Sequence, residues 1–370
     1  MFRRHLRSVL AAAGIALLSA AATAPVASRD AHAAMGLDGD PKVAFLYIAP
    51  VGDGGWTFMH DQSRKALEAE LGSEVAFTEN IPEVTERVRQ VIDRYVKRGY
   101  NVIVGTAYGY SDAFAEAAKE YPEVVFLNAA GYTSAPNLTS YYGRSYEGMY
   151  LAGMAAGAVS KTGKLGFVAA YPLGLVNWNI NAFALGAQKM NPDAEVIVSF
   201  TNTWYDPVKE EAAAQALIEQ GVDVIAQHQD TPGPQIAAER AGIHSVGYNA
   251  DMSSSAPNAH LVASVFDWGK FVLPAVKRAQ DGSFEGGFAF EGMDTGVVGI
   301  SDFTSDAVPE AAKKEIMATA EKIANGDFYV FSGPIAKQDG TIVVPDGEGY
   351  PMDKLFGMDF LVKGTVGSLE

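Results

Sequence analysis

An internal repeat is the feature that most limits how this chain can fold. Residues 164–178 align with residues 42–56 without a gap, at a shift of 122 positions (Lys164 against Lys42), and the segments share lysine, phenylalanine, proline, glycine and tryptophan. The same shift places Val102 on Val224. Two matching segments at one shift indicate that the chain consists of two copies of one lobe.

Each copy alternates short apolar runs with amphipathic segments, a pattern typical of parallel βαβ units. We therefore expect an α/β protein of two Rossmann-like lobes with parallel sheets. Lobe 1 should contain residues 34–143 and about 267–285, and lobe 2 residues 144–266 and about 286–335. The tail, residues 336–370, is not assigned to either lobe. The strands are expected at 43–49, 75–78, 102–106, 124–128, 165–170, 195–200, 224–227, 245–247 and 261–265, and the helices at 58–71, 84–98, 112–120, 146–160, 179–190, 207–220, 234–241 and 268–281.

The N-terminal residues 1–33 have the pattern of a secretory signal peptide. Arg3 and Arg4 precede the apolar run 9–22, and Ala31–Ala33 fits a small-x-small cleavage site. We therefore expect export to the periplasm, with cleavage near Ala33. The chain has no cysteine, so we expect neither a disulfide nor a lipid anchor. Its net charge of −16 argues against a nucleic-acid partner.

The loop after the first expected strand is a candidate ligand-binding loop. Its glycines allow the backbone to approach a ligand, and Trp56 offers a flat apolar face for stacking, with a core role as the alternative. Ligands of open α/β sheets bind beyond the carboxyl ends of the strands. Tyr108, just past the third strand, is therefore also a candidate. The candidates in lobe 1 are Asp53, Gly55, Trp56, Thr57, Phe58 and Tyr108.

In lobe 2 the candidates follow the corresponding strands. Trp178 is the repeat partner of Trp56, although an ordinary exposed turn would also explain it. Trp204 is a second stacking candidate. His228 is either a ligand group or a structural histidine, and Asp230 is the preferred acceptor for a ligand N–H group, because polar side chains at the end of a buried strand orient small ligands.

The last candidates have competing structural roles. One of Asn249 and Asp251 should enter the cleft while the other caps a turn. Trp268 either belongs to a hinge between the lobes or contacts ligand. There is no zinc spacing, nucleophile elbow, Walker loop or dinucleotide fingerprint. We therefore expect no metal, no cofactor and no catalysis, although Asp53 and Asp251 remain a formal acid/base pair for a hydrolase.

At these residues the chain resembles the basic membrane protein (BMP) family of ABC-transporter solute receptors, which includes purine-nucleoside-binding lipoproteins. The resemblance implies a type I periplasmic binding fold, whose two lobes close on a ligand. It also implies delivery of that ligand to the permease and ATPase of an ABC importer. The matching segments are Gly52–Thr57, Tyr146–Gly153, Phe183–Asp193 and Gly221–Asp223.

Three departures from the family pattern concern sugar recognition. The family's Asp-x-Ser-Phe-Asn loop here reads Asp53–Thr57, its Asp-x-Asp has become Asn249–Asp251, and Phe266 and Asp267 replace a lysine expected for ribose. The resemblance therefore implies a purine nucleobase or similar flat heterocycle, bound by a monomeric receptor. A nucleoside receptor, a nucleoside hydrolase and a sensory receptor are the alternatives.

Overall fold

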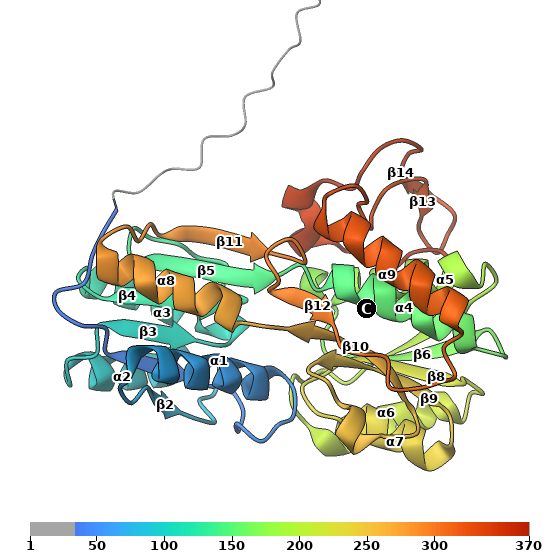
Figure 1. Cartoon of the computed structure of the whole chain (residues 1–370), viewed down its shortest axis with the longest axis horizontal. Helices are drawn as coiled ribbons and strands as arrows, with labels where there is room; N and C mark the ends of the chain where they lie inside the picture. Colours follow the sequence, from blue (N-terminus) through green and yellow to red (C-terminus); the bar gives the residue numbers. More distant parts are fainter. Residues whose placement is uncertain (1–33, 370) are drawn as a thin grey trace, which may run out of the picture. The chain divides into compact units, whose positions relative to one another are not determined.

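The computed structural model describes residues 34–369, so the expected signal peptide lies outside the described residues. The described chain forms two parallel sheets with helices on both faces (Figure 1). We call each sheet with its helices a lobe. The core strands of lobe 1 are buried along their whole length, which is why their sequences read as continuous apolar runs.

Lobe 1 has a six-stranded sheet in the order β11-β5-β4-β3-β1-β2, and every pairing in it is parallel. Helices α1 and α8 pack side by side on one face, and α2 and α3 pack against each other. The elements of lobe 1 are β1 (Val43–Leu46), α1 (Trp56–Leu71), β2 (Ala76–Thr78), α2 (Thr85–Val96), β3 (Val102–Gly105), η1 (Tyr108–Tyr110), α3 (Ser111–Glu120), β4 (Val125–Ala129), β5 (Leu138–Gly143), α8 (Gly269–Asp281) and β11 (Gly287–Glu291).

Lobe 2 has a seven-stranded sheet in the order β12-β10-β9-β8-β6-β7-β15, in which only the β10–β12 pairing is antiparallel. Its elements are α4 (Tyr146–Val159), β6 (Lys164–Ala169), α5 (Gly174–Met190), β7 (Glu195–Phe200), α6 (Pro207–Ile218), β8 (Val224–His228), α7 (Gly233–Ala241), β9 (His244–Asn249), η2 (Ser253–Ser255), β10 (His260–Phe266), β12 (Val298–Ile300), α9 (Glu310–Ala324) and β15 (Thr365–Val366).

The strand orders confirm that both lobes are built on one plan. The sequence β2-β1-β3-β4-β5-β11 in lobe 1 corresponds to β7-β6-β8-β9-β10-β12 in lobe 2. The 122-residue shift also holds at the fifth strand, because it places Leu138, the first residue of β5, on His260, the first residue of β10. The predicted α/β fold with two parallel sheets is therefore present.

Two of the motifs shared with the BMP family have a packing role in this structure. A Cβ atom at Gly153 of α4 would lie 2.2 Å from the carbonyl oxygen of Phe183 in α5, and one at Gly186 would lie 2.0 Å from that of Tyr150. Real Cβ atoms do not come so close, so glycine is needed for the two helices to pack at this distance.

The chain passes between the lobes after β5, after β10 and after β11. Because β11 pairs with β5, lobe 1 extends to Glu291, beyond the boundary that we expected near residue 285. The tail belongs to lobe 2: β15 pairs with β7, and the side chain of Asn181 bonds to the backbone of Phe360 and Val362. The tail also contains β13 (Ile335–Ala336), β14 (Ile342–Val344) and η3 (Met352–Gly357).

Candidate functional site

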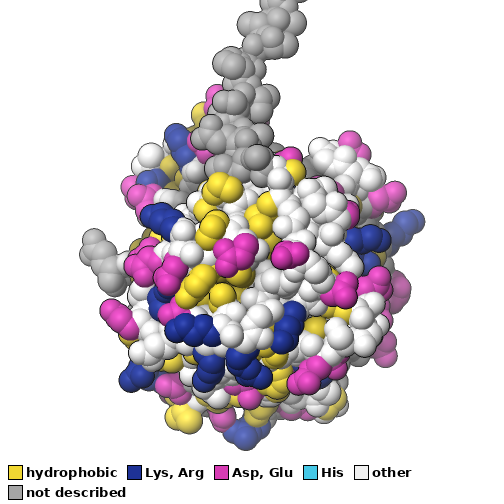
Figure 2. Space-filling model, turned by 90° about the vertical axis from the view of Figure 1, so that its left-hand side faces the viewer, with side chains coloured by type: hydrophobic (Ala, Val, Ile, Leu, Met, Phe, Trp, Pro, Cys, Tyr) yellow, Lys and Arg dark blue, Asp and Glu magenta, His cyan; other side chains and the backbone are white. Residues whose placement is uncertain are grey.

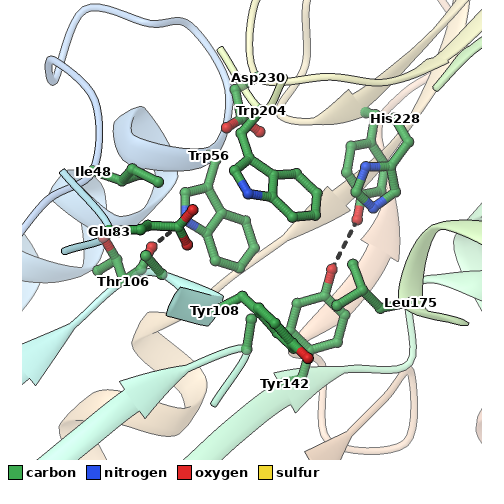
Figure 3. A pocket seen from close by; sticks show the side chains of 13 residues that line it. Ile48, Trp56, Glu83, Thr106, Tyr108, Tyr142, Leu175, Trp204, His228 and Asp230 are labelled. Carbon is green, nitrogen blue, oxygen red and sulfur yellow. Dashed lines mark hydrogen bonds between the residues drawn. The ribbon is translucent and has the colours of Figure 1, made fainter. Parts of the chain in front are cut away.

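A cavity lies between the lobes, at the carboxyl ends of their strands (Figure 3). This is where an open α/β sheet is expected to bind a ligand. Its lining is mainly aromatic and aliphatic, with two carboxyl groups and one imidazole. The lining residues are Ile48, Trp56, Glu83, Thr106, Ala107, Tyr108, Ala130, Tyr142, Leu175, Trp204, His228, Asp230 and Tyr248.

Trp56 is the first residue of α1 and presents its indole ring to the cavity. The indole Nε1 donates a hydrogen bond of 2.7 Å to the carbonyl oxygen of Thr106. The ring is only 7% exposed and packs edge-on against His60 and Trp268, with centroid separations of 4.6 and 5.3 Å. Trp56 is therefore at once a core residue and part of the cavity wall.

Lobe 2 contributes a second indole, that of Trp204 in the loop after β7. Its ring contacts Tyr171 edge-on at 4.8 Å and lies in front of Trp56 in Figure 3. The Trp204 side chain lies near the Glu83 carboxyl group and partly offsets the rise in pKa that burial causes there. Glu83 also accepts a 2.6 Å hydrogen bond from the backbone amide of Gly109, next to Tyr108. Glu83 thus connects aromatic wall residues of both lobes.

The floor of the cavity is made by residues of both lobes. The hydroxyl groups of Tyr142 in β5 and Tyr248 in β9 lie 3.3 Å apart and form a hydrogen bond (Figure 3). The ring of His228 stacks on Tyr248 at 4.4 Å. Both ring nitrogens of His228 are buried and have no hydrogen-bond partner, and burial lowers its pKa to about 4. At neutral pH this imidazole is uncharged, with one nitrogen to donate and one to accept.

Asp230 lines the cavity, and its carboxyl group lies beside the two indoles in Figure 3. The side-chain amide of Asn249 donates to its Oδ1 at 3.3 Å and also to the carbonyl oxygen of Gln229. Burial raises the pKa of Asp230 well above its usual value, and the nearby carboxyl groups of Asp53, Glu210 and Glu83 raise it further. Asn249 itself does not line the cavity; it orients the aspartate.

The loop residues 53–58 organise the start of α1. The Asp53 carboxylate accepts hydrogen bonds of 2.8–2.9 Å from the backbone amides of Gly55, Thr57 and Phe58. These amides would otherwise be unpaired at the helix start, so Asp53 acts as its cap. None of Asp53, Gly55, Thr57 and Phe58 lines the cavity. Their role in this structure is to hold Trp56 in place.

The two lobes touch directly at this loop. A Cβ atom on Gly55 would lie 2.5 Å from the carbonyl oxygen of Asp230, and one on Gly54 would lie 3.2 Å from Pro232. Gly54 has a φ of +82°, in the left-handed region that glycine tolerates. The glycines therefore allow a backbone contact between the lobes beside the cavity. The sequence instead suggested that they allow the backbone to approach a ligand.

The structure places three of the candidate residues away from the cavity. Trp178 is not on a loop, because α5 already begins at Gly174; its ring is fully buried and its Nε1 donates to Ser145, while Leu175 lines the cavity instead. Trp268 is buried behind Trp56. Asp251 does not enter the cavity, because its carboxylate caps the following turn through the amide of Ser253.

The structure brings five of the predicted residues to the cavity wall: Trp56, Tyr108, Trp204, His228 and Asp230. Sequence reasoning missed Glu83 and the tyrosine pair Tyr142 and Tyr248. Glu83 follows β2 in the position that Trp204–Asp206 occupy after β7, so the repeat carried a signal for it. The tyrosines lie within strands, where only their pairing across the lobes distinguishes them from core residues.

Within residues 34–369, no group of three or more His, Cys, Asp or Glu side chains is arranged to hold a metal ion. In the same part of the chain, no helix has the length and apolar character to cross a membrane. The cavity wall itself offers aromatic faces and a few polar groups, which suit stacking on and hydrogen bonding to an organic molecule.

Residues 40–331 match the family model described as Bmp, ABC transporter substrate-binding protein PnrA-like. The chain belongs to this family. It is 41% identical over 327 residues to a purine-binding protein of Brucella abortus, and the aligned region covers 88% of this chain and 92% of the relative. It is also 39% identical over 294 residues to a Haloferax volcanii protein provisionally named as an ABC-transporter glucose-binding protein, with 79% and 74% of the two chains covered.

Solved structures of solute-binding proteins share the fold of this Bmp family member. One from Aeropyrum pernix superposes with a TM-score of 0.70 at 20% identity, covering 85% of this chain and 95% of its own. One from Conexibacter woesei gives 0.66 at 22% identity, with 78% and 98% covered. The family consists of ABC-transporter substrate-binding proteins, so the chain is a solute-binding protein and not an enzyme.

Proposed function

We propose that the protein is the periplasmic receptor of an ABC importer and that it binds a purine nucleobase in the cavity between its lobes. The observation that carries this proposal is that an indole from each lobe, Trp56 and Trp204, lines one cavity together with Asp230 and His228. Two flat apolar faces suit a planar ring, and the polar groups set its orientation. The purine-binding relative in Brucella abortus supports the same reading.

Direct contacts with the ligand are proposed for Trp56, Tyr108, Trp204, His228 and Asp230. We propose supporting roles for Asp53, Gly55, Thr57, Phe58 and Asn249, which shape the loops around the cavity, and for Trp268, which packs behind Trp56. Glu83 joins the proposed site because it contacts both Trp204 and the turn that contains Tyr108. The receptor is proposed to act as a monomer.

A base is favoured over a nucleoside because the candidate sugar-binding positions point elsewhere. Asp251 caps a turn, and Asp267 accepts a hydrogen bond from the amide of Gly269. A ribose in this cavity would have to share Glu83, Asp230 and His228 with the base. Stacking on two indoles instead uses the ring itself, and each stacked pair contributes about 0.5–1.5 kcal/mol beyond burial.

Native mass spectrometry of the protein purified without added ligand, followed by calorimetry of protein that has been unfolded and refolded to empty it, tests the proposal. We expect a purine base to copurify and to bind more tightly than adenosine, inosine or glucose. Tighter binding of adenosine would favour the nucleoside receptor, and tight binding of glucose would favour a sugar receptor. Release of ribose from inosine would establish a hydrolase.

Export is tested separately. We expect cold osmotic shock of the producing cells to release the protein with an N-terminus near Ala34, because residues 1–33 have the pattern of a signal peptide. Protein that keeps its first residues and stays with the spheroplasts would contradict a periplasmic location. Deletion of a neighbouring permease gene should abolish uptake of the labelled base while leaving binding by the purified receptor unchanged.

A further inference from the structure

We propose that the ligand is an uncharged heteroaromatic base that directs an amino or ring N–H group at Asp230, and that anionic purines are rejected. This inference rests on the proposed function and narrows its ligand class. It makes Asp230 the residue that determines specificity among purines. Three observations carry it.

The first observation is the position of Asp230 in the cavity. Its carboxyl group lies beside the two indoles in Figure 3, and within residues 34–369 Asn249 is the only side chain that donates a hydrogen bond to it, at 3.3 Å to Oδ1. When it is ionised, the Asp230 carboxylate accepts hydrogen bonds and donates none. A planar ring held between the indoles therefore meets an acceptor at its edge, which an N–H group satisfies and an oxo group does not.

The second observation is that His228 has unpaired polar atoms. The side chain is 4% exposed, lines the same cavity, and neither Nδ1 nor Nε2 has a hydrogen-bond partner. Buried polar atoms without partners are unfavourable, so such a group at a cavity wall indicates a partner that arrives with the ligand. An uncharged imidazole can donate to a ring nitrogen of a base or accept from its N–H group.

The third observation is the charge of the wall. Glu83 and Asp230 are its ionisable acids, His228 is uncharged, and no Lys or Arg is among the lining residues. Asp53 and Glu210 lie close enough to Asp230 to oppose its ionisation. Two like charges repel more strongly in a poorly hydrated cavity than in water. An anionic ligand would meet this negative potential without a cation to offset it.

The affinity of the wild-type protein for a purine should therefore depend on the charge of the purine and on the hydrogen-bonding groups at the edge of its ring. Adenine and hypoxanthine are uncharged at neutral pH and carry N–H groups, whereas urate is an anion. We expect calorimetry at neutral pH to give adenine or hypoxanthine an affinity at least tenfold higher than that of urate. Equal affinities for urate and the uncharged bases would overturn the inference while leaving the proposed function intact.

Asp230→Asn is the matched change in the protein, because the amide has the shape of the carboxyl group but can also donate a hydrogen bond. Loss of a charge-assisted hydrogen bond should weaken binding of the preferred base by roughly 10- to 100-fold. The disadvantage of urate should shrink, because a negative charge is removed. Asp251→Asn is the control: it removes the same charge from an exposed residue outside the cavity, and both affinities should stay unchanged.

Thermal melting of the empty variants keeps this test interpretable. Burying an amide costs less than burying a carboxylate, so Asp230→Asn should melt no lower than the wild type. A variant that folds normally and binds the base as tightly as Asp251→Asn would refute the role of Asp230. If no purine binds the wild type at all, the proposed function fails, and this narrower inference falls with it.

Discussion

The indole nitrogen of Trp56 donates its hydrogen bond, 2.7 Å long, to the main-chain oxygen of Thr106 at the end of β3. Nε1 is the only polar atom of this side chain, so the ring meets the cavity with apolar surface alone. The same ring packs on Trp268, which follows β10 and leads back into lobe 1. The residue proposed to stack on the ligand is thus fixed to one lobe and packed against a connection between both.

Trp56→Phe should weaken ligand binding and lower stability together. The smaller ring loses stacking area, and the carbonyl oxygen of Thr106 loses its buried partner, which costs about 1–3 kcal/mol. Trp178→Phe is the comparison, because Trp178 is equally buried and also bonded through Nε1, but lies outside the cavity. It should lower the melting temperature with little change in affinity, as measured by calorimetry. The same affinity loss in both variants would contradict a specific role for Trp56.

Gly55→Ala should oppose the approach of the lobes. The added Cβ would lie 2.5 Å from the carbonyl oxygen of Asp230, which is closer than real Cβ atoms come to a backbone atom. We expect at least a tenfold loss of affinity and a larger radius of gyration in solution scattering with ligand present. Gly52→Ala, whose Cβ would meet no atom within 4 Å, should behave as the wild type.

Asp53→Ala should destabilise the protein through α1. The carboxylate pairs three backbone amides at the helix start, and loss of such a cap costs about 1–2 kcal/mol. Denaturant unfolding measures this loss, and Asp53→Asn, which keeps an acceptor, should lose less. Binding should weaken modestly in both, because Trp56 begins the same helix. Unchanged unfolding in Asp53→Ala would mean that Asp53 does not cap the helix in solution.

Ligand affinity should fall as the pH is lowered. The pKa of Asp230 is raised by burial and by the carboxyl groups of Asp53, Glu210 and Glu83, so acidification protonates it at a higher pH than an exposed aspartate. The charged acceptor is present above this raised pKa and lost below it. His228 faces the same cavity but stays uncharged until about pH 4. Calorimetry at successively lower pH should show the decline in the wild type and a flatter profile in Asp230→Asn.

Glu210 should make the empty protein less stable as the pH rises. Burial raises its pKa from 4.5 to about 7, despite hydrogen bonds from Thr231 and from the amide of Asp206. An acid with a raised folded-state pKa keeps its proton in the folded chain while the unfolded chain has lost it, so stability declines between about pH 4.5 and pH 7. Glu210→Gln should flatten this decline by roughly 1–3 kcal/mol in denaturant unfolding. An unchanged slope would contradict this assignment.

The positions of the strands could be predicted because parallel strands buried on both faces are short, apolar and repeated along the chain. The start of α5 could not be predicted, because the turn after β6 is shorter than the corresponding turn after β1. Trp178 therefore lies in a helix and not in the expected loop. The same difference places Leu175 on the cavity wall. Its repeat partner, Asp53, caps a helix instead.

The site was predictable where polar residues directly follow strands, as at His228 and Asp230. It was not predictable where residues within strands pair with a neighbour in the other lobe, as Tyr142 does with Tyr248, because nothing in the local sequence records that contact. The distribution of charged residues along the sequence was also of little help in predicting the site. On the face drawn in Figure 2, acidic and basic side chains are interspersed despite the net charge of −16.

The repeat suggests two copies that could fold separately, yet each lobe includes elements that follow the other copy in the sequence. Helix α4 follows the last strand of the first copy but packs on lobe 2, while α8 and β11 follow the second copy and complete lobe 1. Cutting the chain at residue 143 would therefore leave one fragment without an edge strand and a covering helix. Because each lobe is completed by chain that follows the other copy, we expect both lobes to melt together in a single calorimetric transition.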